Sequence, residues 1–205
     1  MAVVIGTNSG FVSTAPTSNP SGSNPGAFSD QARAIEDTSP ATAERVTEIG
    51  FYAGQATAEC NFEVGIYEDD GGNPGALLGV SRTNAKGTTE GWKKATVDIT
   101  IIPNTLYHMA FQLDADGVRV DYGNDARGYT LKDGVTTLPD PYAGTPQANF
   151  IFAIYAVWDV APTPDPVVIE GSLEKKDIRH SYELPVPVEK DEDLSVGAIM
   201  PRRAY

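Results

Sequence analysis

The segment GIYEDDGGNPGALLG, residues 65–79, decides the fold that we expect for this chain. It places the acidic run Glu68–Asp70 and a glycine-rich, proline-containing stretch between two apolar stretches. Three interpretations compete: a calcium loop, a phosphate-binding loop, and a turn between two strands. Asp and Asn side chains stabilise turns, glycine allows positive φ, and Pro74 fixes φ before Leu77 and Leu78 return the chain to a core. The segment therefore favours a strand, a turn and a second strand.

The two ligand-binding interpretations fail on spacing and charge. A helix-loop-helix calcium site needs a bidentate glutamate at the end of its loop, and counting from Asp69 that position is Val80. A phosphate loop needs a Gly-Lys-Ser/Thr motif that leads into a helix, whereas Pro74 follows the glycines and the carboxylates would repel phosphate. We expect no cofactor. Weak candidates for a non-helical calcium site remain, namely Asp69 and Asp70 here and Asp114 and Asp116 in the later turn LDADG.

Period-two alternation of apolar and polar residues recurs along the chain on both sides of this segment. Short alternating stretches separated by Gly, Pro, Asn and Asp predict an all-β fold, an antiparallel β-sandwich. The best helix candidate is SDQARAIED, residues 29–37, which is equally compatible with a loop. The residues expected to share one face of a strand are Thr47, Ile49 and Phe51; Cys60, Phe62, Val64 and Ile66; Val97, Ile99 and Ile101; Tyr107, Met109, Phe111 and Leu113; and Phe150, Phe152, Ile154, Ala156 and Trp158.

Composition divides the chain into three parts. Residues 1–42 are rich in Ser, Pro, Asn and Gly and are expected to form an extended N-terminal arm. Residues 43–160 are expected to form the sandwich. Residues 161–205 begin with closely spaced prolines, which predicts a stiff linker followed by an extended C-terminal arm. Apolar residues recur in this last part, and we expect them to lie along a partner: Ile178, Leu184, Val186, Val188, Leu194 and Ile199.

Charge and cysteine content exclude several classes of function. The chain has 205 residues and a formal net charge of −13, which argues against binding to nucleic acid or to anionic lipid. Cys60 is the only cysteine, so no intrachain disulfide can form, and its place on an alternating strand predicts a buried, inert thiol. No basic, apolar leader follows Met1 and no apolar run is long enough for a bilayer, so we expect no secretory signal and synthesis in the cytoplasm.

Candidate catalytic residues are few. His108 and His180 are the only histidines. His108 is expected on the strand face opposite Tyr107, exposed or packed at a sheet surface, and His180 falls in the C-terminal arm. Neither lies near a Gly-flanked serine and no His or Cys cluster has metal-ligand spacing, so we expect no enzyme activity. Trp92 and Trp158 are expected at the core or its rim, although several exposed aromatic rings on one face would instead suit sugars.

The segment 65–79 and the sequence that follows it resemble a recurring jelly-roll-like β-sandwich module. Its pattern is G-x-Y-x-D-x-G-x-x-P-G-x-L-L-G, then Gly-Trp, then Thr-x-Tyr-x-x-Ala. Such modules are appended to extracellular bacterial proteins and also occur in bacteriophage virion proteins. The resemblance spans about residues 45–115 and carries no catalytic residues. The matching residues are Gly65, Tyr67, Asp69, Gly71, Pro74, Gly75, Leu77, Leu78, Gly79, Gly91, Trp92, Thr105, Tyr107 and Ala110.

The resemblance and the two arms together lead to an expected function. We expect a non-enzymatic virion structural protein, either a capsid decoration (cement) protein or a head-fibre protein. It would form a homotrimer and bind the major capsid protein or other virion proteins through its arms. The alternative is a carbohydrate-binding adhesin module that recognises glycans on the host surface.

Overall fold

The computed structural model describes residues 1–20, 30–56, 59–114 and 119–160, and these residues form strands and loops without a helix. The strands are β1 (Gly10–Val12), β2 (Gln31–Thr38), β3 (Arg45–Ala53), β4 (Asn61–Asp69), β5 (Pro74–Ala85), β6 (Gly91–Thr100), β7 (Leu106–Leu113), β8 (Tyr122–Asn124), β9 (Tyr129–Asp133), β10 (Thr145–Gln147), β11 (Phe150–Phe152) and β12 (Ile154–Asp159).

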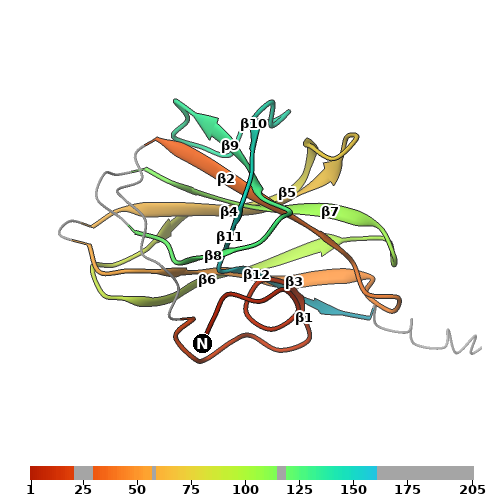
Figure 1. Ribbon diagram of the computed structural model, residues 1–205, viewed down its shortest axis with the longest axis horizontal. Helices are drawn as coiled ribbons and strands as arrows, with labels where there is room; N and C mark the ends of the chain where they lie inside the picture. Colours follow the sequence, from red (N-terminus) through yellow and green to blue (C-terminus); the bar gives the residue numbers. More distant parts are fainter. Residues whose placement is uncertain (21–29, 57–58, 115–118, 161–205) are drawn as a thin grey trace, which may run out of the picture. The chain divides into compact units, whose positions relative to one another are not determined.

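The strands form two layers, which confirms the expected antiparallel β-sandwich (Figure 1). A four-stranded sheet has the order β1-β12-β3-β6, and a six-stranded sheet has the order β10-β9-β2-β7-β4-β5. A small two-stranded sheet pairs β11 with β8. Every pairing is antiparallel except that of β1 with β12, which is parallel. The jelly-roll detail of the expectation stays a prediction.

The main core lies between the two sheets and is rich in aromatic rings. Phe51 from β3 stacks on Phe111 from β7, with ring centroids 5.0 Å apart and planes 13° apart. Phe62 from β4 meets Phe51 edge-on at 5.2 Å. These rings face one another because strand alternation turns every second side chain inward. The predicted inward-facing sets on β4 and β7 are buried as expected, and so is Cys60, which immediately precedes β4.

Strand β3 contains an irregularity that alternation could not reveal. The register shifts between Val46 and Glu48 against β6, and a shift is also present against β12. Val46 and Ile49 are therefore both fully buried, although an odd spacing would normally put them on opposite faces. Thr47 is only half-buried, and its hydroxyl donates to the carbonyl of Val157. The prediction that Thr47 shares the core face with Ile49 is wrong.

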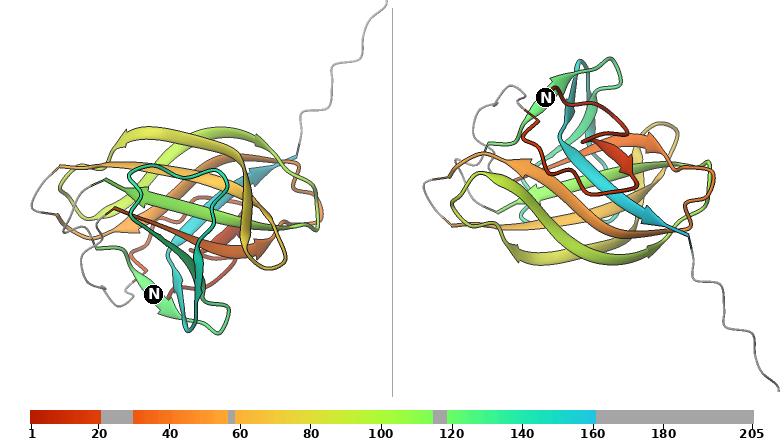
Figure 2. Two further views of the ribbon diagram at one scale, coloured as in Figure 1. Left: turned by 90° about the horizontal axis from the view of Figure 1, so that it is seen from above. Right: turned by 90° about the horizontal axis from the view of Figure 1, so that it is seen from below.

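The described residues among 1–42, namely 1–20 and 30–42, do not form an arm, because they supply two strands of the sandwich. Strand β2 lies in the six-stranded sheet between β7 and β9, where a helix or loop was expected for residues 29–37. Ala32 and Ala34 face one side of the sheet and Ile35 the other, so small side chains hid the alternation. Strand β1 lies along β12, as the lower face in Figure 2 shows, and buries Phe11.

The predicted long strand from 150 to 158 is two strands. Phe150–Phe152 pairs with β8, whereas β12 begins at Ile154 and pairs with β3. The break at Ala153 places the two strands in different sheets. Phe150 therefore leaves the core and is 37% exposed, while Phe152 stays buried.

The predicted C-terminal linker and arm, with Ile178, Leu184, Val186, Val188, Leu194 and Ile199, lie outside the described residues. In the part of the chain that the structure describes, no helix has the length and apolar character of a membrane span.

Candidate binding surfaces

The segment that opened the sequence argument forms a hairpin between β4 and β5, as predicted. The amide of Gly72 donates to Asp69 Oδ1 at 2.9 Å, and the amide of Asp70 donates to the carbonyl of Asn73 at 2.7 Å. Gly71 and Gly72 adopt positive φ angles of 64° and 86°, which favour glycine. Leu77 is partly buried, but Leu78 is 38% exposed, so the prediction that Leu78 returns to the core is wrong.

His108 lies on the outer face of the six-stranded sheet, opposite the face that carries Tyr107, as predicted. It is nevertheless buried, and its Nε2 lies 2.9 Å from Asp69 Oδ1. Strand register places it between Glu36 on β2 and Tyr67 on β4. Asp69 therefore contacts both the turn amide and the histidine, and this pair of contacts accounts for an aspartate at this point of the hairpin.

The calcium candidates do not come together. Asp114 lies beside the start of β4, where it accepts from the amide of Asn61 at 2.7 Å and from its Nδ2 at 3.0 Å. Asp69 and Asp70 follow at the opposite end of that strand, about 25 Å away at the usual rise per residue. Asp116 lies outside the described residues. Within the described ranges, no group of three or more His, Cys, Asp or Glu side chains is placed to hold a metal ion.

The aromatic residues are mostly used for packing. Trp92 lies edge-on between Tyr52 and Tyr155 at 5.3 and 5.2 Å, and its Nε1 donates to the carbonyl of Ser18. Tyr52 donates to Glu90, and burial together with this bond raises the pKa of Tyr52 to about 12. Trp92 is thus part of the core rim, as predicted. Burial likewise raises the pKa of the Cys60 thiol, which lowers its thiolate content.

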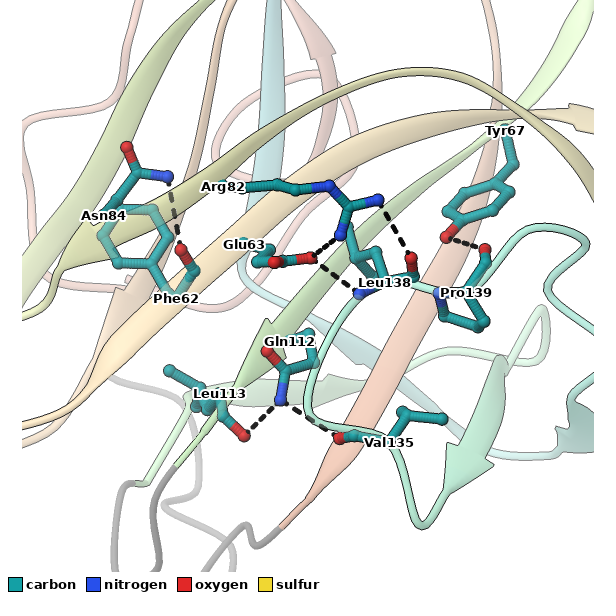
Figure 3. A network of polar contacts seen from close by, with 10 residues as sticks. All are labelled: Phe62, Glu63, Tyr67, Arg82, Asn84, Gln112, Leu113, Val135, Leu138 and Pro139. Carbon is teal, nitrogen blue, oxygen red and sulfur yellow. Dashed lines mark hydrogen bonds and ion pairs between the residues drawn. The ribbon is translucent and has the colours of Figure 1, made fainter.

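The loop between β9 and β10 covers the outer face of the six-stranded sheet and is fixed there by polar contacts (Figure 3). Glu63 Oε2 accepts from the amide of Leu138 at 2.7 Å and from Arg82 at 2.6 Å. The hydroxyl of Tyr67 donates to the carbonyl of Pro139 at 2.7 Å. Beneath this cover, the alanines of β2 and β7 leave room for the fully buried ring of Tyr142. These buried polar groups hold the cover in place, and a hollow of about 110 Å³ lies beside Glu63 and Gln112.

Two hollows on the described surface have volumes above 300 Å³. The first has a volume of about 530 Å³ and is lined by Asn124, Asp125, Ala126, Asn149 and Phe150. The ring of Phe150 packs edge-on against Tyr122 at 4.8 Å and keeps part of its surface exposed. Hydrogen bonds from Arg127 lower the pKa of Asp125, so this carboxylate stays charged in mildly acidic solution. The sequence missed this hollow because Phe150 was assigned to the core.

The second hollow is a groove of about 340 Å³ at one end of the sandwich. It lies between the end of β4 and the loop from β6 to β7. Its lining combines acidic and apolar side chains: Glu68, Asp69, Ile102, Thr105, Leu106 and Tyr107. The resemblance pattern included Asp69, Thr105 and Tyr107, but no sequence signal identified Ile102, whose side chain is exposed.

No family model, curated protein or solved structure matches this chain.

Proposed function

We propose that this chain is a non-enzymatic structural protein of a virion, a capsid decoration or head-fibre protein. In this proposal it is made in the host cytoplasm, assembles as a homotrimer, and binds the major capsid protein or other virion proteins through residues 161–205. The resemblance of about residues 45–115 to modules of virion proteins supports it, and so does the strongly acidic composition, which disfavours binding to nucleic acid.

One structural observation carries most of the argument. Side chains between Val3 and Ala156 bury one another in the described core, and both facing surfaces of the sandwich are occupied by them. In this proposal, the apolar residues that recur after Pro166 serve a partner. An extended segment that contacts a lattice through many copies gains avidity, because each bound copy raises the effective concentration of the next contact.

Particles that lack this chain, mixed with purified protein, provide the test. Full-length protein is expected to sediment with the particles, whereas protein lacking residues 171–205 should remain in the supernatant. Circular dichroism and thermal unfolding must first establish that the truncated protein keeps the sandwich. A second variant, which keeps every residue but has Val186 and Val188 replaced by Ser, should bind more weakly than wild type. Full decoration of particles by the truncated protein would refute the proposal.

The first hollow favours a second candidate function, recognition of a glycan. Sugars present an apolar ring face and a ring of hydroxyls, which suit an exposed aromatic ring beside carboxamides. Phe150 supplies the ring, and Asn124 and Asn149 supply the carboxamides around the same space. A glycan array probed with wild type and with Phe150→Ala, each with and without a chelator, tests this function. Uniform signals over all glycans, or equal binding by the variant, would exclude it.

A further inference from the structure

Ile102 is an apolar side chain held out into solvent by a well-braced loop. It is 65% exposed, more than the other large exposed hydrophobic residues of the described chain. Its backbone is held in place, because its amide donates to the hydroxyl of Tyr107 at 2.9 Å. Its carbonyl accepts from Ser39 Oγ at 2.7 Å, and Ser39 Oγ in turn accepts from the amide of Thr105 at 3.0 Å. These hydrogen bonds fix the loop in a conformation in which the side chain of Ile102 is exposed to solvent.

The groove beside Ile102 has an acidic wall. Glu68 lines it and is exposed, and no ion pair joins Glu68 to another described residue. Asp69 lies next to it, with one carboxylate oxygen already bound to the turn amide and near His108. Leu106 and Tyr107 form the remaining apolar part of the lining. An apolar contact and a free carboxylate thus lie side by side in one hollow.

We propose that this groove binds a segment of a partner protein that carries an apolar side chain next to a lysine or arginine. The apolar side chain would pack on Ile102 and Leu106, and the cation would pair with Glu68. A braced loop loses little conformational entropy on binding, so a small contact of this kind can still contribute affinity. The net charge of −13 adds long-range attraction for a basic segment.

The inference about the groove rests on the proposed function, because the position of the groove suits a second contact with the same partner. The amide of Glu44 donates to the carbonyl of Asp159, and the amide of Ile101 donates to the carbonyl of Glu44, each at 3.0 Å. The end of β12 therefore lies at the same end of the sandwich as the loop from β6 to β7, which contains Ile102; Figure 1 shows this end of β12. A partner bound by the residues that follow Val160 would be tethered at this end. The groove would then add a second contact at high effective concentration.

Fluorescence anisotropy with the full-length chain tests the groove without particles. The probe is a fluorescein-labelled peptide in which arginine alternates with leucine. The control is an acidic peptide of the same length with glutamate in place of each arginine. Ile102→Asp is expected to weaken binding of the basic peptide by about tenfold or more, as for an anchor residue. Glu68→Gln should weaken it severalfold, and more at low salt than at high salt.

Two matched controls separate the groove from general attraction to an acidic surface. Val4→Asp places the same new charge at another exposed apolar residue, which is 45% exposed. Asp133→Asn removes one negative charge from a different exposed position. Both should bind within about twofold of wild type, a change of under ~0.5 kcal/mol.

Equal weakening by test and control variants, or equal binding of the acidic peptide, would overturn the proposal. Self-association of the wild type that Ile102→Asp abolishes would overturn it too, by making a second copy the occupant. Failure of the particle experiment would count against the proposed virion role alone, because the peptide measurement involves no virion protein.

Discussion

Phe51 occupies the centre of the main core, where it contacts Phe62 and Phe111 from the opposite sheet. Its side chain is fully buried. Phe51→Ala would remove these contacts and leave a cavity, so the free energy of unfolding should fall by about 3–5 kcal/mol. Urea unfolding followed by tryptophan fluorescence measures this change.

Phe150 is the matched control, because it is the same residue type at the surface. Phe150→Ala should lower the free energy of unfolding by about 1 kcal/mol or less, since the ring is partly exposed and loses mainly its contact with Tyr122. Equal losses for Phe51→Ala and Phe150→Ala would contradict the division between core and surface that the structure describes.

Asp37 anchors the N-terminal segment from inside the sandwich. Its Oδ2 accepts from the amide of Phe11 at 2.9 Å, and Arg127 lies 4.0 Å from its Oδ1. Burial raises the pKa of Asp37 above its ordinary value, against the opposing effect of these partners. A raised folded-state pKa means that the folded state binds the proton more tightly. The contribution of Asp37 to stability is therefore full below the unfolded-state pKa of about 3.9 and is lost as pH rises through the folded-state pKa.

Asp37→Asn keeps an acceptor for the Phe11 amide but removes the titrating group. The free energy of unfolding of the variant, relative to wild type, is expected to increase as pH rises from about 3.5 to 6. Urea unfolding of both proteins across this range gives the difference curve. A difference that stays constant with pH, or that changes in the opposite direction, would show that the carboxyl is not desolvated in the folded state.

At the scale of elements, Glu63 joins strand β4 to the loop that covers it. Its side chain is 8% exposed and holds both the amide of Leu138 and Arg82 of β5 (Figure 3). Glu63→Gln weakens two charge-assisted bonds at a buried position, so the free energy of unfolding should fall by about 1–3 kcal/mol. Hydrogen exchange should also quicken at the Leu138 amide, because the loop is released locally.

An exposed ion pair on the other sheet provides the comparison. Asp98 lies 3.5 Å from Arg45 with its side chain 77% exposed. Asp98→Asn should change the free energy of unfolding by less than about 1 kcal/mol, since water and salt screen such pairs. If the two substitutions cost the same, the bond from Glu63 to the covering loop is not formed in solution.

Sequence predicted the elements whose signals are local. The hairpin at 70–73 follows from glycines that tolerate positive φ and from Asp69, and β7 follows from its strict alternation. Strand β2 was missed because Ala32 and Ala34 pack against a covering loop that lies far along the chain. The irregularity at Thr47 depends on pairing with two other strands, which no single-strand pattern contains.

The candidate surfaces were harder still to predict. Ile102 was part of a plain apolar run in sequence, and its exposed position is seen only in the fold, where its carbonyl accepts from Ser39 and its amide donates to Tyr107. Likewise Phe150 fitted a long alternating strand until the chain changed sheets at Ala153. Both features arise from tertiary contacts, so composition and periodicity carry no signal for them.

At the scale of the whole molecule, the N-terminal residues and the C-terminal residues are expected to behave differently. Residues 1–12 belong to the body: Val3 and Phe11 are buried in the main core, and Gly10–Val12 pairs with β12. Residues 161–205 are proposed to serve a partner. Two truncations therefore distinguish an element of the fold from a binding segment, although composition placed both in arms.

Removal of residues 1–12 should lower the free energy of unfolding by more than about 4 kcal/mol, because burial of each large apolar side chain contributes about 1.5–3 kcal/mol. It would also expose the edge of β12, so the shortened protein should aggregate more readily. Removal of residues 161–205 should leave the melting temperature of the sandwich within about 2 °C of wild type. Differential scanning calorimetry of both truncations tests the contrast. A large loss of stability on C-terminal truncation would mean that these residues complete the sandwich, and their apolar side chains would then not be free for a partner.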